Sequence, residues 1–411
     1  MKILWVKAGK LLPVDTGGKI RSYNLLVQLA KTDEVTLLSY YGGKKDPAYE
    51  ADIGRQLPGA EVIYTAAPES TLRQSIDYLL HLPASAPYAV SKFTDPQVRQ
   101  SVSKSLREHR YDAAVCDFLS ASLNFPNDSP VPVVLFQHNV ESSLWQRMAD
   151  GETNPVRKLS YRIEAGKMAR YERNALGKFD HVIAVSEHDR NQMLAMDNTC
   201  PISVVPTGVD TSKYQRVASA PGDPPIVVFT GSMDWEPNVD AVEYFCREVW
   251  PNVLAEFTSA RFEIVGRNPS ARVQRLASDT VVVTGTVPSV SDHLRDATVV
   301  VVPLRIGGGT RLKIFEAMAM GKAMVSTSIG AEGLDLQHGR DLMLADNAQG
   351  FATAVLYLLR DAALRCRYED AAAKLAAQYD WSHIARRFAD VLEISGAGHP
   401  GKQKAASAVR P

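Results

Sequence analysis

Residues 303–333 read PLRIGGGTRLKIFEAMAMGKAMVSTSIGAEG, and this stretch decides the fold. Its pattern predicts a strand at 299–303, a glycine turn, a helix from about 310 to 320 and a second strand at 323–327. These four parts form a βαβ unit, in which the glycine turn can approach a phosphate closely. The chain is therefore predicted to contain at least one parallel α/β sheet.

Two cations and a carboxylate follow the glycine turn. The turn contains Gly307, Gly308 and Gly309. Arg311 and Lys313 fall in the first predicted helical turn, where the helix dipole disfavours a cation unless an anion binds there. Glu316 follows one turn later and can accept hydrogen bonds from a sugar diol, so the set predicts a sugar-phosphate pocket. In the alternative interpretation, Thr310 caps the helix, and Lys313 and Glu316 are a solvated i,i+3 pair.

Length and composition limit the classes of protein. A chain of 411 residues with 45% apolar residues is predicted to form two domains. Its 46 basic and 46 acidic residues cancel, so no global field favours nucleic acid. The four cysteines form no CxxC pair, and no run approaches the roughly 20 apolar residues that span a bilayer. The N-terminal apolar run is too short for a signal peptide, so the expected location is cytoplasmic.

Strand-like and helical patterns alternate along the whole chain, which is typical of doubly wound sheets. In the first half the strands are predicted at 3–6, 35–39, 62–64, 113–116, 133–136, 182–185 and 202–205. After a linker at 216–225, they are predicted at 227–230, 262–265, 281–284, 299–302 and 324–327. We therefore predict Rossmann-like domains at 1–215 and 216–381, a helix at 382–395 and a disordered tail at 396–411. Strand ends of two such domains would face a cleft.

Neither domain has Gly-x-Gly-x-x-Gly after its first strand, and a Walker A motif is absent. A nicotinamide or flavin cofactor is therefore not expected. Gly17 and Gly18 open a helix after the first strand, where they either approach a ligand or make a tight turn beside a solvated Lys19. His138 and Asn139 follow another strand, at the edge where ligands bind, although a lone histidine is commonly a core residue.

Two further segments have competing interpretations. Gly231 and Ser232 follow the first strand of the second domain and can donate to a phosphate, whereas Ser232 or Asn238 can equally be a helix cap. The helix at 155–178 is strongly basic and either lies against anionic lipid at the inner face of the membrane or has a solvated face.

The residues Lys313 to Lys322, KIFEAMAMGK, carry a resemblance to a known family. Together with Gly17-Gly18, His138-Asn139 and the segment PTGVD at 206–210, they resemble the retaining glycosyltransferases of family four, which have the GT-B fold. The likeness extends over about residues 1–395. The segments GGKIRSYNLL and APYAVSKF are similar to the subgroup found with exopolysaccharide and cell-surface glycan systems.

The resemblance implies roles for individual residues. Glu316 would hold the ribose hydroxyls of a nucleotide sugar, and Arg311 and Lys313 would face its diphosphate. His138 would contact the donor sugar near the reacting carbon, and its backbone carbonyl could stabilise positive charge. The implied catalytic set is His138, Arg311, Lys313 and Glu316. The implied donor-binding set is Gly17, Gly18, Arg21, Asn139, Gly231, Ser232, Val287, Gly307, Gly308, Gly309 and Thr310. The last helix would cross back onto the first domain.

Two positions depart from the family pattern. Gly308 stands where many members have an earlier acid near the donor sugar, and GSMDWEPN at 231–238 lacks the usual Arg and Lys. The diphosphate assignment then depends on Arg311 and Lys313.

The implied reaction is transfer of a sugar from a UDP- or GDP-sugar to a saccharide or lipid-linked acceptor with retention, without a metal or cofactor. A sugar-nucleotide epimerase and a degenerate scaffold that binds a glycan or a protein partner are the alternatives.

Overall fold

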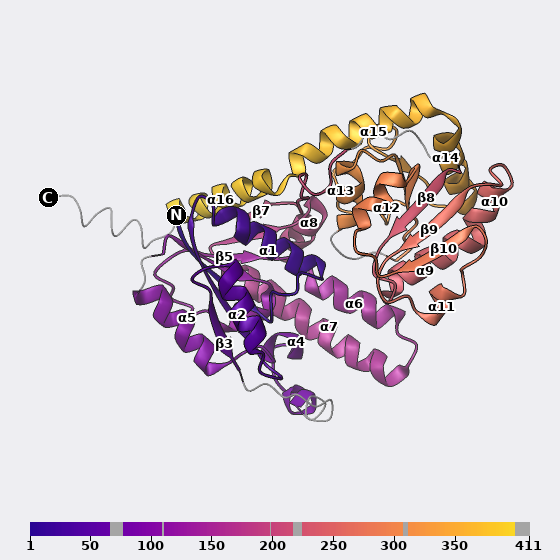
Figure 1. The fold of residues 1–411 in the computed structure, drawn as a ribbon. Coiled ribbons are helices and arrows are strands. Elements are labelled where there is room, and N and C mark those ends of the chain that lie inside the picture. Colours follow the sequence, from indigo (N-terminus) through magenta and orange to yellow (C-terminus); the bar gives the residue numbers. More distant parts are fainter. Residues whose placement is uncertain (66–76, 109–110, 198, 217–223, 307–310, 399–411) are drawn as a thin grey trace. The chain divides into compact units, whose positions relative to one another are not determined.

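The computed structural model describes residues 1–65, 77–108, 111–197, 199–216, 224–306 and 311–398 (Figure 1). The chain divides into two compact units, Met1–Pro206 with Ile384–Pro411, and Thr207–His383. Most of the predicted linker and the predicted disordered tail lie outside the described residues.

The first unit is built on a seven-stranded sheet in which all neighbouring strands are parallel. Its strands are β1 (Lys2–Ala8), β2 (Glu34–Tyr41), β3 (Glu61–Tyr64), β4 (Ala113–Asp117), β5 (Val133–Phe136), β6 (His181–Ala184) and β7 (Ile202–Val204). Their order is β3-β2-β1-β4-β5-β6-β7. The central strands are continuous apolar runs, as expected for a sheet that helices cover on both faces.

Most helices of this unit connect successive strands. They are α1 (Gly17–Leu29), α2 (Pro47–Gln56), α4 (Tyr88–Ser91), α5 (Pro96–Glu108), α6 (Glu141–Gly151), α7 (Pro155–Leu176), α8 (Glu187–Met196) and α16 (Trp381–Gly398). Of these, α6 and α7 form a helical hairpin that projects from the sheet (Figure 1).

The second unit has a six-stranded sheet, also wholly parallel among the described strands. Its strands are β8 (Ile226–Thr230), β9 (Arg261–Val265), β10 (Val281–Gly285), β11 (Val299–Val302), β12 (Met324–Ser326) and β13 (Met343–Leu344). Its helices are α9 (Glu236–Tyr244), α10 (Trp250–Leu254), α11 (Ala271–Gln274), α12 (Val290–Asp296), α13 (Leu312–Ala319), α14 (Ala348–Arg360) and α15 (Ala362–Ala376). The predicted strands are all present, and β13, only two residues long, was not predicted.

Both sheets reverse their strand order at one point, between β1 and β4 in the first and between β8 and β11 in the second. In open α/β sheets, ligands bind at the carboxyl ends of the strands beside this switch point. The segments after β4 and β8 are therefore the places where the topology favours a site in each unit.

The last helix belongs to the first unit, which confirms the predicted return of the chain. Phe388 of α16 stacks on Trp5 of β1, with ring centroids 5.3 Å apart, and both side chains are fully buried. Two full aromatic side chains bury enough surface to fix the helix in place.

The two units meet along the chain at residues 206 and 384, so the first division precedes the linker predicted at 216–225. Contacts within the second unit explain why residues 207–211 belong to it. Val209 forms a β-bridge with Asp380, and Thr211 Oγ1 donates to the Asp380 carboxylate at 2.5 Å. Gly208 lies against the ring of Trp381, where a Cβ would come within 2.6 Å of ring carbons. These contacts hold residues 207–211 in the second unit.

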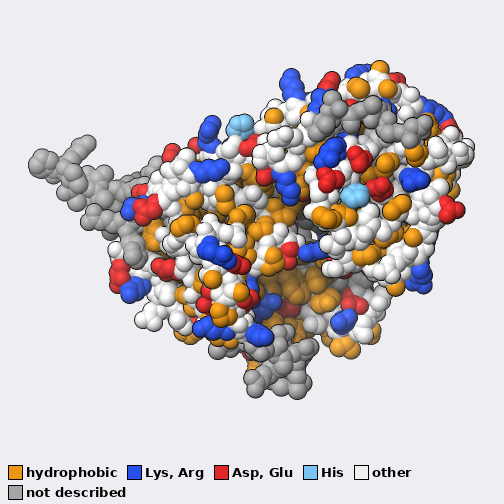
Figure 2. Space-filling view, viewed as in Figure 1, with side chains coloured by type: hydrophobic (Ala, Val, Ile, Leu, Met, Phe, Trp, Pro, Cys, Tyr) orange, Lys and Arg blue, Asp and Glu red, His pale blue; other side chains and the backbone are white. Residues whose placement is uncertain are grey.

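Basic and acidic side chains are interspersed over the face shown in Figure 2. This distribution agrees with the zero net charge of the sequence. Among the described residues, no helix combines the length and apolarity needed to cross a membrane.

Candidate functional site

In the second unit, α13 begins at Leu312, two residues later than predicted. Arg311 precedes the helix in a left-handed conformation, with φ of 50°. The prediction that Arg311 lies in the first helical turn is therefore wrong. The change of helix start leaves Lys313 as the cation of the first turn, where it requires a compensating negative partner.

Lys313 lies at the switch point between β8 and β11. Its Nζ donates to Asn238 Oδ1 at 2.8 Å and lies 4.0 Å from the centre of the Phe229 ring. Burial, with a contribution from the charge of Arg311, lowers the pKa of Lys313 to about 7. A lysine with such a pKa gains a full positive charge when an anion binds beside it.

Asn238 holds Lys313 beside the turn after β8. It lies in the first turn of α9, and its Nδ2 donates to the Ser232 carbonyl at 2.9 Å while its Oδ1 accepts from Lys313. Trp235, and not Ser232 or Asn238, occupies the cap position of α9. The helix-cap interpretation of these two residues is therefore wrong.

The turn after β8 leaves no room for side chains. A Cβ on Gly231 would lie 2.8 Å from Asn238 Nδ2 and 3.1 Å from Lys313 Nζ. A Cβ on Gly266 would lie 1.6 Å from the Gly231 carbonyl oxygen. Two backbones thus approach each other directly beside the lysine, as expected where a ligand must approach the main chain.

Glu316 lies one turn after Lys313, on the same helix. Its Oε1 accepts a hydrogen bond from Tyr214 Oη at 2.9 Å. Burial raises the pKa of the Glu316 carboxyl, and the Tyr214 hydrogen bond opposes that rise. The carboxylate thus has one hydroxyl partner already, which shows that its position suits hydroxyl donors.

Arg311 has a different environment from Lys313. Its guanidinium donates to the Ile329 carbonyl at 2.7 Å and lies 3.4 Å from the Glu332 carboxylate. The side chain is buried, and these contacts tie the start of α13 to the segment after β12. In this arrangement the charge of Arg311 is matched within the protein.

The other predicted residues of this unit lie as follows. Ser232 Oγ donates to Asp234 Oδ1 at 2.6 Å and accepts from Arg267 Nε at 3.1 Å. Val287 follows β10 and packs against the apolar core. The predicted donor-binding residues Gly307, Gly308, Gly309 and Thr310 lie outside the described residues.

In the first unit, a buried carboxylate occupies the end of β4. Asp117 is fully buried and has three donors: Lys7 Nζ at 3.1 Å, Trp5 Nε1 at 3.0 Å and His138 Nε2 at 2.9 Å. Burial alone would raise the pKa of Asp117, but Lys7 and His138 hold it well below its usual value. The carboxylate is therefore ionised and accepts all three hydrogen bonds.

The ionised Asp117 fixes the tautomer of His138. A carboxylate only accepts, so Nε2 carries the proton, and burial lowers the pKa of His138 to about 3, which keeps the ring neutral. Nδ1 is then an acceptor, and it has no hydrogen-bond partner among the described residues. It lies 3.7 Å from the position of a Cβ on Gly18. A buried acceptor without a partner favours a hydroxyl ligand at this point.

Phe118 covers His138. Its ring stacks on the imidazole with centroids 3.7 Å apart, and a Cβ on Gly18 would lie 2.6 Å from it. Phe118 has a positive φ of 69°, which costs a bulky residue about 1–3 kcal/mol and is most often found at functional sites. Gly18 is thus required because an aromatic ring occupies the space of its missing side chain.

The remaining predicted residues of the first unit surround this cluster. Gly17 is the first residue of α1. Arg21 is buried, donates to the His138 carbonyl at 3.4 Å, and has its pKa lowered by burial to about 9. Asn139 hydrogen-bonds to the carboxyl of Glu141, whose pKa is raised by burial to about 7. The His138 carbonyl, to which the resemblance assigned the stabilisation of positive charge, thus has the Arg21 guanidinium as one partner.

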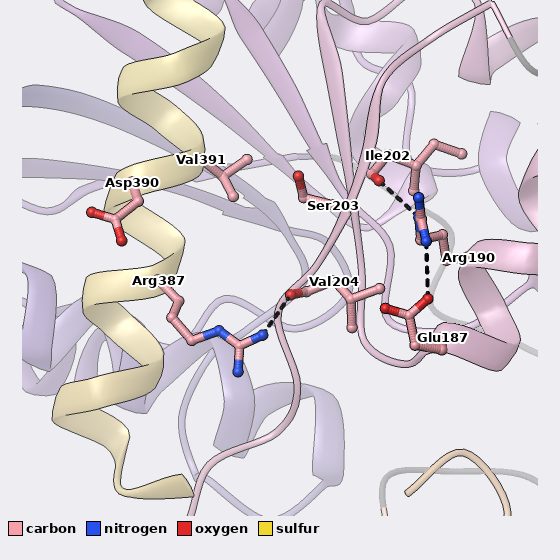
Figure 3. Close-up of a pocket in the computed structure, with 8 residues that line it drawn as sticks. All are labelled: Glu187, Arg190, Ile202, Ser203, Val204, Arg387, Asp390 and Val391. Atoms are coloured by element: carbon pink, nitrogen blue, oxygen red, sulfur yellow. Dashed lines mark hydrogen bonds and ion pairs between the residues drawn. The ribbon is translucent and has the colours of Figure 1, made fainter. Parts of the chain in front are cut away.

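An open pocket of about 360 Å³ lies elsewhere in the first unit, between α8, β7 and α16 (Figure 3). Arg190 donates to the Ile202 carbonyl and Arg387 to the Val204 carbonyl. These are the outward carbonyls of edge strand β7, so both arginines cover a sheet edge that could otherwise pair with another chain. Within the described part of the chain, no group of three or more His, Cys, Asp or Glu could hold a metal ion.

Sequence reasoning missed four residues that the structure places in these clusters. They are Lys7, Asp117, Tyr214 and, as a partner of Lys313, Asn238. Asp117 was missed although it directly follows the strand predicted at 113–116, just as His138 follows the strand predicted at 133–136. Tyr214 was not open to prediction, because it lies at the end of the first predicted domain, whereas its partner Glu316 belongs to the second.

Comparison with known proteins gave matches in both units. Residues 17–213 match the family described as Glycosyltransferase Family 4, and residues 224–361 match that described as Glycosyl transferases group 1. A phosphatidyl-myo-inositol mannosyltransferase of Mycolicibacterium smegmatis is 28% identical over 263 residues, which cover 61% of this chain and 66% of that enzyme, just under two thirds. An uncharacterised 44.6 kDa protein in the cps region of Klebsiella pneumoniae is 22% identical over 86% of this chain and 90% of its own length.

Solved structures agree in fold. Anabaena HepE, solved in complex with UDP, superposes with a TM-score of 0.65 at 16% identity, over 96% of this chain and all of that one. Sucrose-phosphate synthase from Thermosynechococcus elongatus gives a TM-score of 0.72 at 16% identity, over 97% of this chain and all of its own. Together with the two sheets, these likenesses establish the GT-B fold.

Replacing Asp117 and Lys7, singly and together, should show how strongly the two side chains stabilise each other. Asp117→Asn leaves the Lys7 charge buried without its counterion, and we expect a loss of about 3–5 kcal/mol in the free energy of unfolding. Adding Lys7→Met removes the orphaned charge, so the double variant should be more stable than the sum of the single losses predicts. Urea denaturation followed by circular dichroism measures both.

The exposed pair Lys2–Glu34 on the same sheet is the matched control. Lys2→Met and Glu34→Gln should together change stability by less than about 1 kcal/mol. Strictly additive losses at Lys7 and Asp117 would show that the buried pair is not coupled.

Proposed function

The chain belongs to the group 1 glycosyltransferases, and on that premise we propose that it transfers a hexosyl group from a nucleotide sugar to a saccharide or lipid-linked acceptor, with retention. The observation that carries the proposal is the arrangement of Lys313, Asn238 and Glu316 beside Gly231, at the switch point of the second sheet. A cation, a close-approach backbone and a hydroxyl-binding carboxylate fit a diphosphate and a ribose.

For the donor, we propose that Lys313 contacts the diphosphate and Glu316 holds the ribose hydroxyls in place of the Tyr214 hydroxyl. Val287 follows β10 and would lie near the base. The solved HepE contains UDP, which supports a nucleoside diphosphate, and both uridine and guanosine remain in the proposal. Arg311 would act chiefly by fixing the start of α13, since its charge is already matched by Glu332.

The chemistry follows from the charge that develops on the leaving group. As the sugar departs, the diphosphate gains negative charge, and a preorganised cation and backbone amides stabilise it by factors of about 10² or more each. We propose that no metal is required and that the acceptor hydroxyl passes its proton to the departing phosphate. No protein nucleophile enters this scheme.

His138 would bind the sugar through its ring. With Nε2 held by Asp117, the Nδ1 acceptor can receive a hydrogen bond from a sugar hydroxyl. Its carbonyl, which the sequence suggested as a charge stabiliser, already has the Arg21 guanidinium beside it. Asp117 would therefore act as a positioning residue for His138.

For the acceptor, one likeness and one feature of the first unit support a membrane-held substrate. The mycobacterial relative is named a phosphatidyl-myo-inositol mannosyltransferase, and the exposed charges of α7 are basic. We also propose a role in surface polysaccharide synthesis, because the segments GGKIRSYNLL and APYAVSKF are similar to the subgroup found with such systems.

Nucleotide binding tests the donor site directly. The purified chain should be stabilised by one nucleoside diphosphate among UDP, GDP and ADP, equally with and without Mg²⁺. A ligand at 100 times its Kd adds about 2.7 kcal/mol, which is readily seen as a shift in Tm. Glu316→Gln should weaken binding by about 1.5–3 kcal/mol, because a charge-assisted hydrogen bond to ribose is lost.

Glu369→Gln, on α15 of the same unit, is the control for the charge change and should bind as the wild type does. Unchanged nucleotide affinity in Glu316→Gln would remove the ribose role. If none of the nucleotides raises the Tm, the chain is better explained as a degenerate scaffold. Conversion of a UDP-sugar without an acceptor would favour an epimerase.

The pKa of Lys313 predicts a pH dependence of binding. In the free protein this pKa is about 7, so above that pH the lysine is mostly neutral. A diphosphate favours the charged form and raises the pKa, so binding should take up a proton, and affinity should fall by up to about tenfold per pH unit above pH 7. Isothermal titration calorimetry of UDP or GDP in buffers of different ionisation enthalpy measures the uptake.

Lys313→Met should bind more weakly and show neither the proton uptake nor this pH dependence. If the wild type takes up no proton and its affinity is flat across this range, Lys313 does not meet the phosphate.

A further inference from the structure

Exposed apolar side chains gather on one part of the first unit. Thirteen large hydrophobic residues of the described chain are exposed, and six of them belong to the α6–α7 hairpin or to the helical residues 77–81. They are Leu79, Leu80, Met148, Val156, Leu159 and Ile163. Figure 2 shows hydrophobic side chains at the surface of the tip of this hairpin. Single exposed apolar residues are ordinary, but a cluster of this kind marks an interaction surface.

Three of the six form a stripe along α7. Val156, Leu159 and Ile163 are spaced i, i+3 and i+7, and their exposed fractions are 76%, 61% and 40%. This spacing places them on one helical face. The opposite face, which includes Met168 and Ala175, is buried against the sheet. The helix therefore has apolar residues on its solvent side as well as on its core side.

The segment carrying Leu79 and Leu80 is fastened to the same helix. Tyr78 Oη and Ser160 Oγ are hydrogen-bonded at 2.8 Å. Lys167 Nζ donates to the carbonyls of His81 and Leu82 at 3.2 and 2.7 Å. The exposed fractions of Leu79 and Leu80 are 61% and 73%. These two leucines therefore extend the apolar stripe of α7 sideways.

The acidic side chains of α7 are buried, whereas its exposed charges are positive. Glu164 and Glu172 are both buried, where they accept hydrogen bonds from the backbone of Tyr88 and from the start of α6. Lys167 is buried too, so this cation of the helix predicted to be basic at 155–178 does not belong to its surface. The exposed charges of α7 are all positive: Arg157, Arg162, Arg170 and Arg173.

We propose that the apolar and basic face made of those six hydrophobic residues and the flanking arginines Arg162, Arg170 and Arg173 docks on an anionic lipid bilayer. The apolar side chains would enter the headgroup region while the arginines contact anionic headgroups. A second copy of the chain fits poorly, because a two-fold contact would oppose arginines to arginines. The inference concerns the first unit alone and does not depend on the donor site.

Flotation of the full chain with lipid vesicles tests the proposal. The protein should float with equimolar phosphatidylcholine and phosphatidylglycerol and not with phosphatidylcholine alone. Leu159→Ser with Ile163→Ser should lower the partition coefficient by at least about tenfold. Arg162→Gln with Arg170→Gln should lower it by about fivefold per charge, and added salt should have a similar effect.

Matched controls come from α16 of the same unit. Ile394, 63% exposed, and Arg386, also exposed, lie away from this face, so Ile394→Ser and Arg386→Gln should float as the wild type does. Glu316→Gln should also float normally, which separates this proposal from the donor site. An unchanged Tm establishes that each variant is folded.

Two outcomes would overturn the proposal. One is equal flotation of the wild type and the Leu159→Ser/Ile163→Ser variant. The other is absence of binding to anionic vesicles, together with a change of oligomeric state in that variant on size-exclusion chromatography, which would assign the face to self-association.

Discussion

The first unit depends on one buried ion pair, between Lys7 and Asp117. A carboxylate taken out of water costs several kcal/mol, and it is tolerated here because three donors converge on it. Those donors come from strand β1 and from the segment that follows β5. Through Trp5, the same carboxylate is linked to the aromatic stack that holds α16. One charge therefore connects the centre of the sheet, the last helix of the chain and the ring proposed to meet the sugar.

In the second unit, close backbone packing and not an ion pair shapes the candidate site. Gly231 and Gly266 bring two strand ends together so closely that side chains are excluded, and Lys313 occupies the space beside them. Its ammonium has a carbonyl oxygen and an aromatic face as partners, both of them neutral. A lysine held in this way keeps its position while its charge remains to be matched, which is the condition a diphosphate would satisfy.

The sequence predicted the two sheets well because their strands are buried apolar runs bounded by glycine and polar turns. It could not predict β13, since two residues carry no periodicity, nor the start of α13, which depends on the left-handed backbone at Arg311. Lys313, Glu316, Gly18 and His138 were identified from local pattern. Their partners Asn238, Tyr214 and Asp117 were not, because each lies more than 20 residues away along the chain and only the fold brings it near.

The return of α16 has a consequence for the order of folding. Residues up to 206 contain the whole first sheet, yet Trp5 meets Phe388 only after the second unit has been synthesised. A growing chain would therefore carry an indole face without its cover while residues 207–383 are synthesised. Of the two units, the one whose sheet is synthesised first is completed second, so a chain that stops before α16 would lose the packing of strand β1.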